Sequence, residues 1–74
     1  MRYSQLDYIV RYNNKSHKLK TLTNITKYCT PLQNAEIYEN ETLVIKIENN
    51  IAIAVIDKMN MIVENINYVK SKEV

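Results

Sequence analysis

The sequence contains no glycine, tryptophan or phenylalanine, and only one proline, one cysteine and one histidine among its 74 residues. Without glycine it cannot form a Gly-rich phosphate-binding loop. A single cysteine cannot form an intramolecular disulfide, and one cysteine, one histidine and two aspartates offer no cluster at metal-ligand spacing. We therefore expect a protein that is not an enzyme, with no catalytic residues, no metal and no cofactor.

Long apolar segments are also missing. No window approaches the ~18 apolar residues of a membrane-spanning helix, and the first twenty residues contain no apolar run like a secretion signal. We expect a cytoplasmic protein with no membrane role.

The residues that are abundant are aliphatic and polar. Ten Ile, six Val and five Leu can form an aliphatic core with the six Tyr at its rim, and 74 residues suit a single domain over 1–74. We expect residues 71–74 to be a frayed tail. The abundance of Asn, Ile and Lys is typical of an AT-rich genome and suggests a phage or mobile element of a low-GC bacterium, among other sources.

The firmest structural signal is a hairpin over residues 42–57. Two runs rich in β-branched residues flank Asn49-Asn50, and asparagine is the next residue after glycine to tolerate a positive φ. Pairing outward from a two-residue turn places Ile47 against Ala52, Ile45 against Ala54 and Lys46 against Ile53. We expect further turns at Asn13-Asn14, Asn40 and Asn60.

A second hairpin is expected near the N-terminus. Residues 6–12 are rich in strand formers and lead through a turn to residues 17–23, although a helix starting at Ser4 is the alternative. The spacing of Leu22, Ile25 and Cys29 predicts a short helix over 24–29. Thr30-Pro31-Leu32-Gln33 fits an N-cap with proline at the first helical position, which predicts another over 31–36.

The rest of the second half resembles a meander, with a strand over Ala35–Glu39 and a last strand from Met61 to residue 70. A helix is the alternative for the last element, because Met59, Ile62, Val63, Ile66 and Val69 share a helical face. The predicted fold class is α+β, mainly β, with a small antiparallel sheet of 5–6 strands and one or two short helices in residues 24–36.

Both faces of the central hairpin are apolar. On one face Ala52 and Ala54 leave a trough, which we expect the Ile25/Cys29 segment to fill. The other face must be covered by the N-terminal hairpin or by a second subunit, which makes a homodimer a candidate assembly. That candidate dimer face consists of Val44, Ile51, Ile53 and Val55.

Charge is divided unevenly along the chain. Residues 1–30 carry six cations against Asp7 alone, whereas residues 31–74 carry a net negative charge. Cations interleaved with tyrosines could bind the phosphates and bases of a nucleic acid, but lysines also protect an edge hairpin from unwanted pairing, and we favour this second explanation. The candidate partner- or nucleic-acid-binding residues are Tyr8, Arg11, Tyr12, Lys15, Lys18, Lys20 and Lys27.

Two other groups could carry chemistry. Glu36, Glu39 and Glu41, with Glu48, form an acidic rim at one end of the predicted sheet, which we interpret as a solvated rim. His17 and Cys29 could form a thiolate pair, but a lone cysteine in a helix is more often an apolar filler.

The sequence favours a non-enzymatic protein-binding module, and the candidate role is an inhibitor or regulator from a phage or mobile element that occupies a surface of a larger host or defence protein. Small size, the absent catalytic groups and the tyrosines support this hypothesis. A nucleic-acid-binding protein that uses the basic N-terminal hairpin is the alternative. No motif in the chain is specific enough to name a family.

Overall fold

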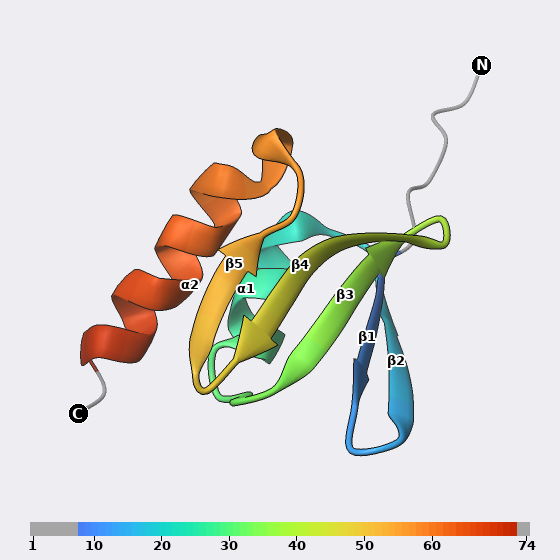
Figure 1. Cartoon of the computed structure of the whole chain (residues 1–74), viewed down its shortest axis with the longest axis horizontal. Coiled ribbons are helices and arrows are strands. Elements are labelled where there is room, and N and C mark those ends of the chain that lie inside the picture. The colour runs from blue at the N-terminus through green and yellow to red at the C-terminus, as the bar shows by residue number, and fades with distance from the viewer. Residues whose placement is uncertain (1–7, 73–74) are drawn as a thin grey trace.

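The computed structural model describes residues 8–72, which form a five-stranded antiparallel sheet and two helices (Figure 1). The elements are β1 (Tyr8–Tyr12), β2 (Lys15–Leu19), α1 (Leu22–Cys29), β3 (Ala35–Glu39), β4 (Thr42–Glu48), β5 (Ile51–Ala54), the 3-10 turn η1 (Asp57–Met59) and α2 (Asn60–Lys72). The strands lie in the order β2-β1-β3-β4-β5. The predicted α+β, mainly β fold class is confirmed.

Asparagine replaces glycine at the tight turns. Asn13, Asn14, Asn49 and Asn50 all have a positive φ, which a type I′ hairpin turn requires at both central residues. The turn between β3 and β4 uses Asn40 and Glu41 in the same way. The register predicted for the central hairpin is confirmed, with Ile47 opposite Ala52, Ile45 opposite Ala54 and Lys46 opposite Ile53. The turn expected at Asn60 does not use a positive φ, and the prediction of a left-handed residue there was wrong. Asn60 is right-handed helical with φ of −56°.

The N-terminal hairpin is confirmed over Tyr8–Leu19, while the first residues of its predicted strand, 6 and 7, and the alternative helix start at Ser4 lie outside the described range. The predicted second strand, 17–23, extends too far, because Leu22 already begins α1. The hydroxyl oxygen of Thr21 accepts a hydrogen bond from the Asn24 amide at 3.1 Å, and this N-cap fixes the start of the helix.

The second short helix, predicted over 31–36, is wrong. Ala35 and Glu36 belong to β3, where they pair with Ile47 and Lys46 of β4. The preceding loop is also held by the central hairpin turn, since the Asn49 amide donates to Asn34 Oδ1 and the Asn50 amide donates to the Gln33 carbonyl. Pairing between distant strands therefore outweighs the local capping signal at Thr30-Pro31. The strand predicted over Ala35–Glu39 is confirmed.

The last element is a helix, so the preferred strand from Met61 to residue 70 was wrong. The buried side chains of α2 are Val63, Ile66 and Lys70, spaced three and four residues apart. Burial of this face outweighs the low helix propensity of the three asparagines in α2. Ser71 and Lys72 still belong to α2, whereas residues 73 and 74 of the expected frayed tail lie outside the described range.

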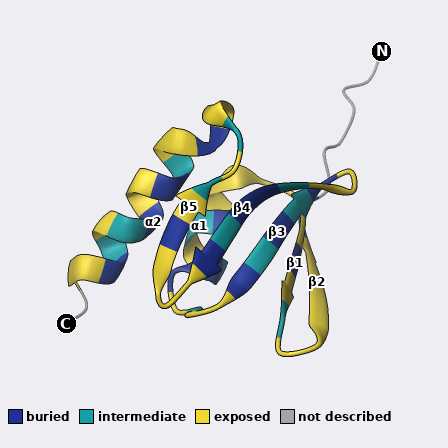
Figure 2. Cartoon of the chain, in the orientation of Figure 1, coloured by how far each residue is buried: buried dark blue, intermediate teal, exposed yellow. Residues whose placement is uncertain are grey.

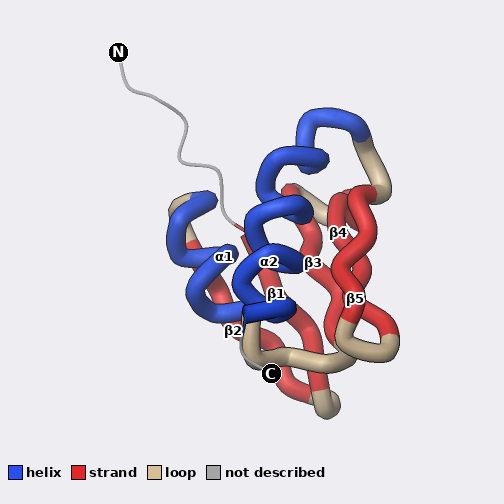
Figure 3. Tube along the Cα trace, turned by 90° about the vertical axis from the view of Figure 1, so that its left-hand side faces the viewer, coloured by secondary structure: helices blue, strands red, loops and turns tan. Residues whose placement is uncertain are grey.

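Both helices cover the same face of the sheet (Figures 1 and 3). The Ile25/Cys29 segment was expected to pack against β5, and this expectation was wrong because α2 occupies that place. Ile25 and Cys29 of α1 are fully buried elsewhere in the same core. Asn67 of α2 binds the outer edge of β5, accepting from the Ala52 amide at 2.9 Å and donating to its carbonyl at 3.0 Å. This side chain occupies the backbone groups that another strand would pair with. Neither helix between residues 8 and 72 is long and apolar enough to cross a membrane.

Candidate functional site

The face of the sheet away from the helices is exposed, and we call it the open face (Figure 2). Directly opposed residues of an antiparallel ladder share a face, so the register assigns its members. One row across the strands is mainly apolar and contains Leu43, Tyr38, Ile9 and Lys18. The neighbouring row is mainly charged and contains Ile53, Lys46, Glu36, Arg11 and Ser16. The open face therefore offers an apolar and a charged row side by side.

Strand β5 and Val55, the residue that follows it, contribute the most exposed apolar side chains of this part of the sheet. Ile51, Ile53 and Val55 are 57%, 47% and 47% exposed. The sequence predicted that they would be covered by the N-terminal hairpin or by a second subunit. The hairpin instead extends the sheet beyond β3, on the far side from β5, so it leaves these residues open.

Val44 was expected beside them and lies in the core instead. The register shifts between Ile37 and Tyr38, which pair with Ile45 and Leu43, so Val44 is the extra residue of a bulge. Val44 and Ile45 are consequently both buried, at 1% and 0% exposure. The apolar part of the candidate dimer face is therefore limited to Ile51, Ile53 and Val55.

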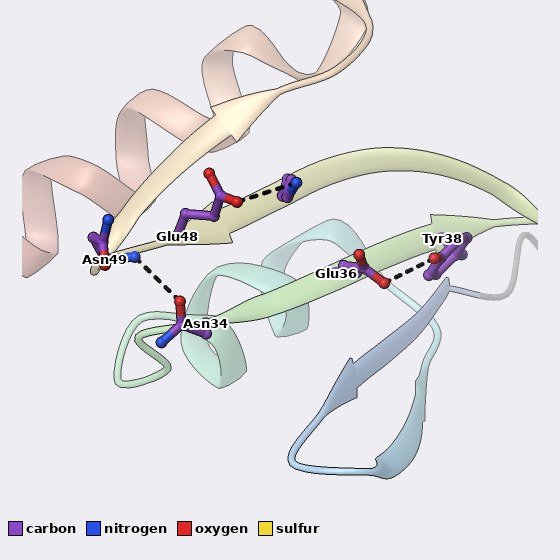
Figure 4. Close-up of polar contacts among 6 residues, drawn as sticks. Asn34, Glu36, Tyr38, Glu48 and Asn49 are labelled. Atoms are coloured by element: carbon purple, nitrogen blue, oxygen red, sulfur yellow. Dashed lines mark hydrogen bonds and ion pairs between the residues drawn. The ribbon is translucent and has the colours of Figure 1, made fainter.

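Charged side chains of the open face contact neighbouring polar side chains (Figure 4). Lys46 Nζ lies 3.1 Å from Glu48 Oε2, and the Tyr38 hydroxyl donates to Glu36 Oε1 at 2.9 Å. This hydrogen bond is the main reason that the pKa of Tyr38 is raised. The Arg11 guanidinium carbon lies 5.9 Å from the centre of the Tyr38 ring. These contacts orient the charges of the face before any partner arrives.

The candidate residues of the basic N-terminal hairpin do not form one surface. Arg11 and Lys18 are on the open face by register, Lys15 and Lys20 lie in or next to edge strand β2, and Lys27 is exposed on α1. Cations thus lie on both sides of the sheet. This distribution fits protection of an edge strand better than one continuous phosphate-binding track.

The tyrosines of the hairpin are occupied within the molecule. Tyr8 is buried, and the Tyr12 and Tyr28 hydroxyls share a hydrogen bond of 2.6 Å. This bond raises the pKa of Tyr28 to about 12. His17 stacks on the Tyr28 ring with a centroid distance of 4.3 Å and an interplanar angle of 8°. None of these three tyrosine rings is presented as a free platform for a nucleic-acid base.

The acidic rim is divided as well. Glu36 and Glu48 are on the open face, whereas Glu39 is buried beside Lys58, with Glu39 Oε1 and Lys58 Nζ 2.9 Å apart. Glu41 is exposed in the turn between β3 and β4. Within residues 8–72 no three His, Cys, Asp or Glu side chains gather closely enough to hold a metal ion.

The thiol of Cys29 lies in the core. Burial raises its pKa to about 12, so it is protonated at neutral pH. The His17 ring is stacked on Tyr28, and this stack explains its position without a thiolate partner. The sequence singled out Ile51, Ile53 and Val55 as a face that must be covered and not as an open surface, because their apolar alternation is equally typical of a buried strand.

No protein family, no curated protein and no solved structure matches this chain.

Proposed function

We propose that this protein is a non-enzymatic protein-binding module whose partner covers the open face. The exposure of Ile51 and Ile53 of β5, and of Val55 directly after it, carries the proposal. Three half-exposed β-branched side chains side by side gain roughly 1 kcal/mol each when a partner covers them. The neighbouring charged row supplies directional contacts, as polar groups do at the edge of many interfaces.

A different protein suits this face better than a second copy. Lys46, Glu36 and Arg11 cross the middle of the sheet in one row. When the two-fold axis of a symmetric pair lies along this row, each charge faces its own equivalent in the second copy. The burial of Val44 also removes one apolar residue from the expected dimer face. A homodimer is therefore the less favoured occupant.

The kind of partner follows from size and composition. A chain of 74 residues rich in Asn, Ile and Lys suits a phage or mobile element, and such small proteins can act by occupying a surface. We propose an inhibitor or regulator that occupies a surface of a larger host or defence protein in the cytoplasm.

A photo-crosslinking experiment tests the open face directly. A benzoylphenylalanine placed at Ile53 should crosslink to a partner protein in cells of the source organism, while the same group at the exposed Asn24, on α1, should not give that product. Capture of the partner should be lost in an Ile51→Lys/Ile53→Lys variant and kept in Asn24→Lys, since these sites are exposed and tolerate lysine. Capture that is unchanged in the β5 variant contradicts the proposal, and a crosslink between two copies assigns the face to a homodimer.

Nucleic acid is the second candidate partner, because exposed Lys15, Lys18 and Lys20 lie in or next to one edge strand. Fluorescence anisotropy with random single- and double-stranded oligonucleotides distinguishes the two functions. Binding that weakens steeply with salt and is lost in Lys15→Ala/Lys18→Ala/Lys20→Ala supports nucleic-acid recognition. Under the protein-binding proposal we expect no such binding at low salt.

A further inference from the structure

A groove lies between the two helices, which cover the side of the sheet opposite the open face (Figure 3). Its volume is about 320 Å³, enough for one or two large side chains. The groove is lined from α1 by Leu22, Thr23, Thr26 and Lys27 and from α2 by Ile62, Asn65, Tyr68 and Val69.

Apolar side chains that the core does not use line and flank this groove. Val63 and Ile66 of α2 are buried, whereas Met61 and Tyr68 are 75% and 62% exposed. Met61 and Tyr68 are seven residues apart, so they lie two turns apart on one flank of the helix. Leu22, 40% exposed, lines the same groove as Tyr68 from the start of α1. These residues add a second exposed apolar surface to that of β5.

The charge at the groove has one sign. Lys27 lines it, and Lys72 Nζ lies 5.1 Å from the centre of the Tyr68 ring. Helix α1 contains no carboxylate, and the single carboxylate of α2, Glu64, is not among the groove-lining residues. An acidic segment with apolar side chains therefore complements the groove, whereas a second copy would bring its own Lys27 and Lys72.

We propose that the groove between α1 and α2 binds an acidic amphipathic helix of a partner protein. The flank from Met61 to Lys72 spans about three turns, or roughly 16 Å. A helix of that length presents apolar residues at i, i+3 or i+4 and i+7, and its flanking carboxylates meet Lys27 and Lys72. Since the groove and the open face lie on opposite sides of the sheet, one molecule can hold two partner segments at once.

A displayed library of random helix-forming peptides of about 16 residues, selected against the full chain, is the probe. We expect enriched peptides to carry apolar residues at helical spacing flanked by Asp or Glu. Their affinity should fall roughly tenfold or more for Leu22→Ser/Tyr68→Ser, whose sites are exposed enough to keep the fold. The affinity should be unchanged for the β5 variant Ile51→Lys/Ile53→Lys, so failure here and failure of the open-face proposal are distinguishable.

Charge reversal sharpens the test. Selection against Lys27→Glu/Lys72→Glu should enrich peptides flanked by Lys or Arg instead. The inference is overturned by selection that enriches no peptide, by enrichment without acidic residues, or by peptides that lose affinity for the β5 variant alone. A single-stranded DNA oligonucleotide that displaces the selected peptides and binds more tightly would assign the groove to nucleic acid.

Discussion

The ammonium group of Lys70 joins three segments that are distant in sequence. It donates hydrogen bonds to the carbonyl oxygens of Thr30 and Leu32 at 2.5 and 2.6 Å and to Asn50 Oδ1 at 2.8 Å. These contacts fasten the end of α2 to the loop after α1 and to the central hairpin turn. A lysine at this position therefore stabilises the fold through these contacts, in addition to placing a favourable charge in the last turn of α2.

We expect Lys70→Met to destabilise the protein by about 2 to 3 kcal/mol, because the apolar stem is kept while hydrogen bonds from a charged donor to buried oxygens are lost. Urea unfolding followed by circular dichroism measures the change. The matched control is Lys72→Met, whose exposed lysine lies over the Tyr68 ring, with an expected effect within ~0.5 kcal/mol. Equal effects of the two substitutions would show that the Lys70 contacts add nothing.

The Cys29 thiol gives a second prediction for a single residue. With its pKa raised from 9.0 to about 12 by burial, the thiolate fraction at pH 8 is lower in the folded chain than in the unfolded chain by a factor of about 10³. We expect Ellman's reagent to react at least that much more slowly with the native protein than with protein in urea. Rapid labelling of the native protein would show that the thiol is accessible.

At the scale of the elements, the turns at Asn13-Asn14 and Asn49-Asn50 have the same backbone conformation and different surroundings. Asn14 is exposed, whereas Asn50 donates its amide to the Gln33 carbonyl and accepts a hydrogen bond from Lys70 through Oδ1. The Asn13-Asn14 turn thus connects β1 and β2, whereas the Asn49-Asn50 turn connects β4 and β5 and also anchors the loop before β3.

This difference predicts opposite effects of one substitution. Asn14→Gly should be neutral or stabilise by up to ~0.5 kcal/mol, because glycine prefers this position of a type I′ turn. Asn50→Gly should destabilise by about 1 to 2 kcal/mol, because the side-chain acceptor of Lys70 is removed. Thermal unfolding of both variants tests the comparison, and a stabilising Asn50→Gly would contradict the anchoring role of this turn.

The hairpins could be predicted from the sequence because their signals are local: β-branched residues around paired asparagines fix both turn and register. The segments 31–36 and 61–70 could not. The segment 31–36 carries a good helix start at Thr30-Pro31, but its last residues pair with β4 and therefore form a strand. The segment 61–70 has features of both a strand and a helix, and the helix forms because it buries Val63 and Ile66.

At the scale of the molecule, five titratable groups within residues 8–72 have a higher pKa in the folded chain than in the unfolded chain. Burial raises the pKa of Cys29 to about 12 and the Tyr12 hydrogen bond raises that of Tyr28 to about 12. The pKa of Tyr8 is raised mainly by burial, that of Tyr38 by Glu36 and that of Lys58 by Glu39. All five shifts have the same sign. The folded chain therefore binds more protons than the unfolded chain in alkaline solution.

Stability should accordingly fall as the pH rises from about 8 towards 12, because Cys29 of the unfolded chain, with a pKa of 9.0, ionises in this range while the folded thiol stays protonated. The Tm should fall by roughly 4–8 °C for each kcal/mol lost. In Cys29→Ala the decline should begin nearer pH 10, where tyrosines titrate. Calorimetry across this range provides the measurement, and a Tm that stays constant to pH 10.5 would contradict the shifts.

The sequence by itself determined the two asparagine hairpins, the strand over Ala35–Glu39 and the mainly β class, because these depend on alternation and turn chemistry between neighbours. Only the tertiary structure decided which face is covered. Both helices pack on one side of the sheet, so Ile51 and Ile53 are exposed while Ala52 between them is buried. An apolar alternation states which residues share a face, but the order of the strands and the placement of α2 decide whether protein or solvent lies against it.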